Sequence, residues 1–420
     1  MSYKLLTHCR ACGLGRPELA TLKQVTGSNL IDKPKTLVEV LNLGVSPLAN
    51  DFKGDGEERS AWYPLKLMWC PRCTLAQLSV VVDPKIIYAK HYPYVTSHSA
   101  TMKDHFIRLT DDLVRETNLK TVVEIGSNDG TYLIHLQEQN IEVIGVEPAE
   151  NLARIATKNG VPTRNEFFNE RLARELNLEG IIPSAIVARH VFCHIDDWTD
   201  TIHALGVLCG KETVIAIEVP YLVNTIENHE WDQIYHEHLS YMTIKAMKYA
   251  LEGSMLHIHG VKYYPIHGGA IVIMLRRNDS EVPPQELPPE NLTLTDLVAF
   301  ADKTELMIVE LANKVANLVN QGKSVVGYGA SAKATQWIHA CGFTRKQIKF
   351  VCDETLQKQW KFMPGTDIPV VDPGALTREL PDYALCFAWN FFDPDIYNKE
   401  VIFREKGGKW ILPVPSLKIV

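Results

Sequence analysis

Residues 122–130 read Val-Val-Glu-Ile-Gly-Ser-Asn-Asp-Gly, a short apolar run followed by a polar turn with two glycines. The apolar residues are typical of a buried parallel strand, and an amphipathic helix is predicted from residue 131. Glycine suits backbone that passes close to a ligand, and the start of a helix offers free N–H groups. The stretch therefore predicts a ligand-binding strand–turn–helix unit, with an ordinary structural turn as the alternative.

A second strand is predicted over residues 141–146, and it ends at Glu147. An acid about twenty residues after the first turn binds the ribose in strand–loop–helix–strand nucleotide sites. The glycine spacing here is Gly-x-x-x-Gly, which differs from the dinucleotide pattern Gly-x-Gly-x-x-Gly. These features point to a nucleotide-like ligand other than a dinucleotide.

Composition restricts the class of protein. A chain of 420 residues is too long for one core, so two or three domains are expected. A net charge of −7 and a pI of about 6.1 argue against binding to nucleic acid. We expect neither a signal peptide nor a membrane span, and nine scattered cysteines suggest a reducing, cytoplasmic location.

Two Cys-x-x-Cys pairs, Cys9 with Cys12 and Cys70 with Cys73, lie in the N-terminal part. Two such pairs fit a tetrahedral zinc site, and four thiolates would leave no open position, so the zinc would be structural. The alternative is one redox pair and one accidental pair. The residues between the pairs predict a small β-rich module.

Residues 91–99 read His-Tyr-Pro-Tyr-Val-Thr-Ser-His-Ser and precede a helix predicted over 102–117. A loop this dense in hydrogen-bonding groups is often a binding loop, although a turn with buried tyrosines is an equal alternative. Strands are then predicted over 185–189, 214–220, 255–264 and 270–276. A parallel sheet finished by an antiparallel hairpin is the plan of class I methyltransferases.

Residues 235–241 read Tyr-His-Glu-His-Leu-Ser-Tyr, the densest group of titratable side chains in the chain. A His-x-His metal pair is the lesser interpretation because no third ligand follows at a known spacing, and a polar surface segment is the plain alternative. A general base beside an orienting carboxylate is the interpretation we favour.

The C-terminal part begins with a proline-rich acidic linker over 281–290 and a helix predicted over 294–319. Residues 324–333 repeat the strand–glycine turn–helix pattern, and further strands are predicted over 348–352, 384–389 and 409–412. We expect a second doubly wound domain. Lys333 could contact a diphosphate, whereas an NAD site with Asp353 or a purely structural turn are alternatives.

Taken together, these motifs resemble the S-adenosylmethionine-dependent C-methyltransferases of nucleotide-linked deoxysugars, the type that forms the branched sugar tetronitrose. The resemblance runs nearly from end to end. It rests on the two cysteine pairs and on residues 92–94, 124–130, 193–195, 220–222, 232–238, 267–269, 327–333 and 387–390. The segment Ile234-Tyr235-His236-Glu237-His238 and the C-terminal Gly-Tyr-Gly-Ala-x-Ala-Lys are the specific parts.

The resemblance implies three domains within an α/β fold. They are a zinc-binding module over 1–82, a class I methyltransferase domain over 83–280 and a Rossmann-like nucleotide-sugar domain over 291–420. The cofactor contacts are then expected from Gly126, Asn128, Asp129, Gly130, Glu147, Pro148 and His194. The substrate contacts are expected from Tyr92, His267, Tyr328, Lys333 and Asn390.

The resemblance also implies a catalytic base, His238, with Tyr235, Glu237 and Tyr94 around the sugar. The proton next to the ketone of a 4-keto sugar is acidic, and its removal gives an enolate that attacks the sulfonium methyl group. A histidine suits this step because its pKa lies near working pH. His236 stands where the tetronitrose type has Asp, so the role of His236 stays open.

The expected partner is a 4-keto-deoxysugar linked to a nucleoside diphosphate such as dTDP or GDP, methylated at C-3′, and the chain is expected to be a monomer. Two rival functions remain. One is an O- or N-methyltransferase, which needs no enolising base. The other is an NAD-dependent sugar-nucleotide oxidoreductase that uses the C-terminal glycine turn.

Overall fold

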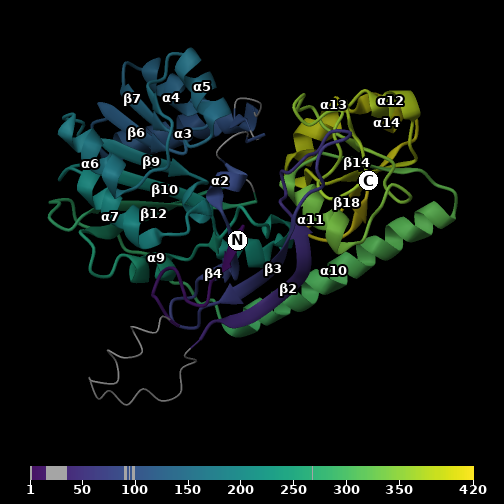
Figure 1. Ribbon diagram of the computed structural model, residues 1–420, viewed down its shortest axis with the longest axis horizontal. Coiled ribbons are helices and arrows are strands. Elements are labelled where there is room, and N and C mark those ends of the chain that lie inside the picture. The colour runs from purple at the N-terminus through teal and green to yellow at the C-terminus, as the bar shows by residue number, and fades with distance from the viewer. Residues whose placement is uncertain (1, 16–35, 89–91, 94, 97–99, 267) are drawn as a thin grey trace.

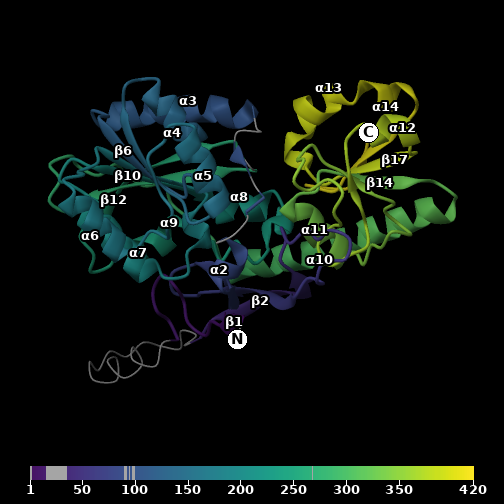
Figure 2. The ribbon, with the colours of Figure 1, turned by 45° about the horizontal axis from the view of Figure 1, so that its top comes forward.

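The computed structural model describes residues 2–15, 36–88, 92–93, 95–96, 100–266 and 268–420. Two sheets, of seven and six strands, form two lobes that stand side by side (Figure 1). The strands β2 (Val38–Pro47) and β3 (Trp62–Trp69) and the long helix α10 (Leu294–Asn320) lie along the base of the molecule (Figure 2). Apolar side chains of these three elements share one core with the six-stranded lobe.

The seven-stranded sheet has the order β12-β13-β10-β9-β6-β7-β8. Its strands are β6 (Thr121–Ile125), β7 (Glu142–Val146), β8 (Thr163–Arg164), β9 (Ala185–Arg189), β10 (Val214–Pro220), β12 (Leu256–Tyr264) and β13 (Ala270–Arg277). Strands β6 to β10 are parallel, whereas β13 is antiparallel to both of its neighbours. This is the predicted class I methyltransferase sheet, so the fold prediction is confirmed.

Both faces of this sheet are covered by helices, which explains its nearly continuous apolar strands. Along β6, Val122 contributes to the core on one face and Val123 to the core on the other. The first core is shared with α3 (Ala100–Glu116), α4 (Thr131–Gln137) and α5 (Glu150–Lys158). The second is shared with α6 (Glu170–Leu178), α7 (Trp198–Leu208) and α9 (Ile244–Ala250).

The N-terminal module has a four-stranded sheet of order β11-β4-β3-β2. Besides β2 and β3, it contains β4 (Ala76–Leu78) and β11 (Ser240–Tyr241). Strand β11 comes from the segment that follows β10 in the chain, more than a hundred residues beyond β4. The same module also pairs β1 (Tyr3–Leu5) with β5 (Val80–Val82), and α2 (Pro84–Ile87) follows. The segment with the candidate base is therefore joined to the module by backbone hydrogen bonds.

The six-stranded sheet has the order β16-β15-β14-β17-β18-β19, with five parallel strands and an antiparallel edge. Its strands are β14 (Val325–Tyr328), β15 (Val351–Cys352), β16 (Val370–Val371), β17 (Tyr383–Cys386), β18 (Lys409–Leu412) and β19 (Lys418–Ile419). Its helices include α11 (Ala332–Ala340), α12 (Ala375–Glu379), α13 (Tyr397–Lys399) and α14 (Val401–Glu405). The predicted Rossmann-like domain is confirmed.

Two predicted strands of this lobe were too long. The strand expected over 348–352 is limited to Val351 and Cys352, the two residues that lie in strand register with β14. The strand expected over 384–389 ends at Cys386 and is followed by the 3₁₀ helix η4 (Trp389–Phe391). The apolar run continues past the strand because Phe387 and Trp389 still pack into the core.

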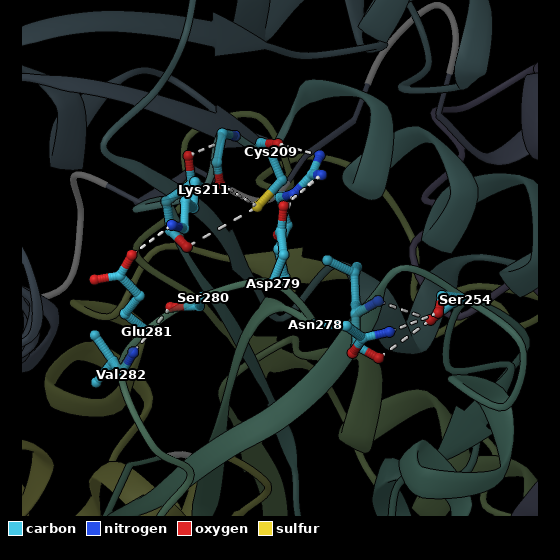
Figure 3. A network of polar contacts seen from close by, with 12 residues as sticks. Cys209, Lys211, Ser254, Asn278, Asp279, Ser280, Glu281 and Val282 are labelled. Carbon is cyan, nitrogen blue, oxygen red and sulfur yellow. Dashed lines mark hydrogen bonds and ion pairs between the residues drawn. The ribbon is translucent and has the colours of Figure 1, made fainter.

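The linker between the lobes is anchored where it leaves the first sheet (Figure 3). The Asn278 side chain donates a hydrogen bond to the Ser254 carbonyl at 2.9 Å, and Lys211 forms an ion pair with Glu281 at 2.7 Å. Helix α10 then begins at Leu294 with a capping box between Thr293 and Asp296. The helix predicted over 294–319 is thus confirmed. Among the described residues, no helix combines the length and apolar character needed to cross a membrane.

Candidate active site and metal centre

The four N-terminal cysteines, Cys9, Cys12, Cys70 and Cys73, come together. Their Sγ atoms all lie within 4.8 Å of one another, with Cys9–Cys73 at 3.4 Å and Cys12–Cys70 at 3.5 Å. These distances exclude disulfides, whose sulfurs lie about 2.05 Å apart. Zinc–sulfur bonds of about 2.3 Å in a tetrahedron would place the sulfurs about 3.8 Å apart. The predicted cysteine set therefore fits a structural zinc ion.

The two cysteine turns have the same backbone form. The Gly13 N–H donates to the Cys9 carbonyl at 3.0 Å, and the Thr74 N–H donates to the Cys70 carbonyl at 2.9 Å. Gly13 and Thr74 also occupy the same left-handed region, with φ of 65° and 63°. Two matching turns that face each other are what a single tetrahedral ion requires.

The predicted cofactor turn lies between β6 and α4, at the carboxyl edge of the sheet. Gly126, Asn128 and Gly130 all have positive φ, of 68°, 54° and 79°. At Gly126 a Cβ atom would lie 2.1 Å from Cγ2 of Val191, so glycine is required there by packing as well as by conformation. The Asp129 carboxylate accepts hydrogen bonds from the N–H and hydroxyl of Thr131 and so fixes the start of α4.

Glu147 directly follows β7 and faces this turn. One oxygen accepts the Asn128 N–H at 2.8 Å and the other accepts the Ala149 N–H at 2.8 Å. Burial raises the pKa of Glu147 to about 7, although the two N–H groups act in the opposite direction. Pro148 follows, and its carbonyl accepts a hydrogen bond from Asn165. Each Glu147 oxygen keeps a further lone pair that a ligand hydroxyl could use.

A buried charge pair beneath the turn was not predicted from the sequence. Glu124 on β6 bonds to Arg189 at the end of β9, with Nε at 2.7 Å from Oε1. The Arg189 guanidinium lies 4.4 Å from the ring centre of Phe106 and 4.7 Å from that of Tyr132. The sequence signal that could have indicated this pair was the presence of one charged residue in each of two otherwise apolar strands. The pair orders the carboxyl ends of two strands that carry the site.

The segment with the candidate base runs from α8 (Leu222–Glu227) through the 3₁₀ helix η3 (Trp231–Gln233) to β11. The His238 ring forms two hydrogen bonds, Nδ1 to the Gln233 carbonyl at 2.9 Å and Nε2 to the Tyr235 hydroxyl at 2.8 Å. Since a carbonyl can only accept, the hydrogen-bond network assigns the ring proton to Nδ1 and a lone pair to Nε2. Burial, followed by the nearby His194, holds the pKa of His238 well below 6.5.

His194, predicted as a cofactor contact, lies beside the candidate base. It ends the 3₁₀ helix η2 (Phe192–His194), and its ring centre lies 5.2 Å from that of His238. Its Nδ1 bonds to the Tyr88 hydroxyl at 3.0 Å, and the Tyr88 ring lies 5.3 Å from Tyr92. Burial lowers the pKa of His194 to about 3. An aromatic cluster thus connects the base to the predicted binding loop.

The predicted binding loop also reaches the cofactor turn. The Thr96 N–H donates to Oδ1 of Asn128 at 3.0 Å. The Tyr92 N–H donates to the Asn151 side chain at 3.1 Å, and that side chain donates back to the Tyr92 carbonyl at 3.0 Å. Asn151 lies in the first turn of α5, the helix that begins shortly after Glu147 and Pro148. The candidate base, the predicted binding loop and the predicted cofactor turn are therefore linked by a continuous series of contacts.

Glu237 and His236 point toward the N-terminal module. Oε1 of Glu237 accepts a hydrogen bond from Asn50 at 3.1 Å, and burial raises the pKa of Glu237 to about 7. His236 is fully buried, and its Nε2 lies 3.2 Å from the Pro64 carbonyl oxygen. The contacts that orient the His238 ring come instead from Tyr235 and Gln233, and Gln233 was missed because a backbone carbonyl leaves no sequence signal.

The C-terminal lobe contacts the same segment through Asp232. This buried carboxylate accepts hydrogen bonds from the indoles of Trp337 at 2.9 Å and Trp389 at 2.7 Å. Nζ of Lys333 lies 4.0 Å from Asp232 and 4.0 Å from the ring centre of Trp389. That ammonium is buried and has no hydrogen-bond partner among the described residues. No sequence pattern indicated this role of Asp232.

The other predicted substrate residues are dispersed. Tyr328 is buried in the C-terminal lobe, where its hydroxyl donates to Glu400 at 2.8 Å. Asn390 is half-buried and follows Trp389 in η4. Tyr94 and His267 lie outside the described residues.

Family models match three parts of the chain. A putative zinc-binding domain matches residues 33–88, a methyltransferase domain matches 99–255, and a C-methyltransferase C-terminal domain matches 265–415. A curated relative, the C-methyltransferase NovU of Streptomyces niveus, is 32% identical over 397 residues, which cover 91% of this chain and 94% of the relative.

Two solved structures also match part of the chain. The cyclopropane synthase MmaA2 of Mycobacterium tuberculosis has a TM-score of 0.34 and 11% identity, over 46% of this chain and 91% of its own. The magnesium protoporphyrin IX methyltransferase of Synechocystis PCC 6803, solved with bound S-adenosylmethionine, has a TM-score of 0.32 and 13% identity, over 42% of this chain and 80% of its own.

Proposed function

The chain belongs to the family of S-adenosylmethionine-dependent C-methyltransferases with a zinc-binding domain, and we propose that its acceptor is a nucleotide-linked 4-keto-deoxysugar. The methyl group goes to the carbon next to the ketone, C-3′. The observation that carries this proposal is the neutral His238 ring, whose Nε2 lone pair is held in place by Tyr235. A methyltransferase acting on oxygen would have no need of a base for a carbon-bound proton.

His238 is suited to enolisation. Its Nδ1–H is fixed by the Gln233 carbonyl. Once the Tyr235 hydroxyl gives up its hydrogen bond to Nε2, this nitrogen accepts the proton from the carbon next to the ketone while the C–H electrons move into the enolate. Bound S-adenosylmethionine supplies an electrophilic methyl group on a positively charged sulfur. The enolate carbon would take that methyl group as the bond from the methyl to sulfur breaks, and S-adenosylhomocysteine would be the leaving group. The enzyme contributes position and proton transfer.

Tyr235, Glu237 and Tyr94 complete the proposed catalytic group. Tyr235 orients the base directly through its hydroxyl. Glu237 acts through the backbone, because its bond to Asn50 fixes the segment on which His238 stands. Tyr94 is assigned to the sugar from the family resemblance alone.

The cofactor is assigned to the turn that contains Gly126, Asn128, Asp129 and Gly130, with Glu147 on the ribose hydroxyls. The support is the left-handed backbone of this turn and the two free lone pairs of the Glu147 carboxylate. Pro148 and His194 extend the same surface toward the base. The turn also offers the N-terminus of α4, whose N–H groups favour polar ligand atoms.

The nucleotide-sugar diphosphate is assigned to Lys333 at the start of α11. A buried ammonium without a hydrogen-bond partner is costly, and a diphosphate oxygen would satisfy it. Nζ of Lys333 lies 4.0 Å from Asp232, which belongs to the segment that carries the proposed base. A sugar bound at that base would have its diphosphate near Lys333. Asn390, Tyr92, His267 and Tyr328 remain further candidates for substrate contact.

The test is turnover with methyl-labelled S-adenosylmethionine across a panel of nucleotide-linked 4-keto-6-deoxysugars, with the product structure read by NMR. We expect the label on C-3′ of one member of the panel. A label on oxygen or nitrogen would overturn the proposed chemistry. A label on another carbon would keep the enolisation and change only the position.

A further inference from the structure

A second cluster of metal-binding side chains lies at the proposed base. One Sγ and two ring nitrogens, from Cys193, His194 and His238, lie within 4.8 Å of one another. Within the part of the chain that the structure describes, this cluster and the N-terminal cysteines are the two such groups of three or more residues. We propose that Cys193, His194 and His238 bind a thiophilic divalent cation such as Zn²⁺, and that the bound cation inhibits the enzyme.

The set of donor atoms is right for such an ion. Zinc takes Cys sulfur at about 2.3 Å and His nitrogen at about 2.0–2.1 Å, so its ligand atoms lie about 3.3–3.8 Å apart. The donor atoms lie within 4.8 Å of one another, so an ion would draw the most distant of them together by at most about 1.0–1.5 Å. Three protein ligands would leave a fourth position for water. One thiolate and two imidazoles favour zinc, cobalt or cadmium over magnesium and calcium.

His194 presents a free nitrogen to this cluster. The Tyr88 hydroxyl has the Glu237 carbonyl as an acceptor at 3.5 Å, and Nδ1 of His194 lies 3.0 Å from the same hydroxyl. If the hydroxyl proton points to the carbonyl, Nδ1 carries the ring proton and Nε2 has the lone pair. This Nε2 is buried and has no hydrogen-bond partner among the described residues. A buried ring nitrogen without a partner is the feature that points to a ligand.

The third ligand, Cys193, makes only a weak contact, with its Sγ 3.7 Å from the His190 carbonyl oxygen. A metal ion binds the thiolate and releases its proton. The contact that the ion disrupts at His238 is the one to Tyr235, because both need the Nε2 lone pair. A ring that holds a cation through Nε2 cannot accept a proton there, and this is why binding inhibits. The inhibitory effect, unlike the binding itself, rests on His238 being the base.

The test uses the full chain with its N-terminal zinc in place, titrated with Co²⁺. We expect about one additional metal ion per chain, an absorption band from a cobalt–thiolate bond, and loss of turnover in step with that band. A mild chelator that leaves the N-terminal zinc bound should restore turnover. Cys193→Ser should abolish the band and raise the Co²⁺ concentration for half inhibition at least about tenfold, since even outer partners of a metal site contribute about that much.

Cys209→Ser is the matched control, because Cys209 is also buried in this lobe but belongs to neither cluster. It should keep the band and the inhibition. Cys193→Ala provides a second variant, and cofactor binding by each variant verifies its fold. Absence of additional metal in the unaltered chain, or a band that persists in folded Cys193 variants, would overturn the site. A band without inhibition would overturn the inhibitory role and also count against His238 as the base.

Discussion

Tyr235 and His238 form a hydrogen bond of 2.8 Å between Oη and Nε2, with their ring centres 4.1 Å apart. The two residues are three positions apart in a turn, so the pair is formed locally. The same turn places the Gln233 carbonyl on the other ring nitrogen. The protein itself therefore holds both ring nitrogens of the proposed base, which lowers the cost of orienting the ring.

Replacement of the base is the first prediction. His238→Asn should reduce kcat by about a hundred- to ten-thousand-fold, the usual contribution of a general base, while both ligands still bind. His135→Asn, at a half-buried histidine on α4, is the control and should leave kcat unchanged. His236→Asn should cost less turnover, since its Nε2 faces the Pro64 carbonyl. Near-normal turnover of His238→Asn would assign the base to another residue.

The pH dependence of kcat follows from the environment of His238. Burial and the nearby His194 hold its pKa well below 6.5, so the ring stays neutral at neutral pH and is protonated only in more acidic solution. We expect kcat to fall on the acid side with an apparent pKa below 6.5 in a profile from about pH 5 to 8. Glu237→Gln is informative because burial raises the pKa of Glu237 to about 7. If this variant shifts the pH at which kcat falls, the fall reports the protonation of Glu237 instead of His238.

Glu147 is predicted to hold the ribose hydroxyls of the cofactor. Glu147→Ala should weaken S-adenosylmethionine binding by about 1.5–3 kcal/mol, the usual contribution of a hydrogen bond to a charged group. Calorimetric titration measures this directly. Glu142→Ala removes an exposed carboxylate at the start of the same strand and should leave affinity unchanged. Equal affinity in the two variants would contradict the assignment.

Lys333 is predicted to hold the diphosphate. Lys333→Ala should raise the dissociation constant of the sugar nucleotide by about ten- to a hundredfold, in line with a charge-assisted bond, and leave S-adenosylmethionine binding unchanged. Lys346→Ala, an exposed lysine of the same lobe, serves as the control. Tight binding of NAD to the unaltered chain, lost in Lys333→Ala, would favour the oxidoreductase function instead.

The N-terminal cysteines are predicted to hold about one zinc ion per chain. Cys70→Ala should lose this ion and lower the melting temperature, because a structural zinc contributes to folding. Metal analysis and thermal unfolding measure the two effects. Cys341→Ala should change neither the metal content nor the activity, since Cys341 lies in α11's C-terminal turn, outside both metal clusters. A fully active, metal-free preparation would refute the structural role.

Much of the fold could be predicted because its signals are local. The apolar runs at 185–189, 214–220 and 409–412 coincide with β9, β10 and β18. Strands buried on both faces are apolar throughout, so their limits are visible in the sequence. At Phe387 the apolar run continues into the core, but the residue lies beyond the end of the strand β17. The same signal therefore overestimates the length of the strand there.

The site was less predictable because its contacts join distant parts of the chain. Asn50 and Glu237 are 187 positions apart, and Trp389 and Asp232 are 157 apart. A lone asparagine in a loop and a tryptophan after a strand carry no local pattern. The cysteine pairs were recognisable because each has an internal spacing that a metal ion dictates. The orientation of His236 away from His238 follows from the turn that contains them, which the sequence did not reveal.

The Asp232 carboxylate accepts hydrogen bonds from the indoles of Trp337 and Trp389, and this limits how the lobes of the enzyme can be exchanged with those of relatives. Asp232 belongs to one lobe and both indoles to the other, so a chimera that exchanges the C-terminal lobe exchanges both donors at once. Each buried polar group left without its partner would cost the hybrid about 1–3 kcal/mol. A C-terminal lobe can therefore be exchanged only between relatives that share these three residues, or together with all three of them.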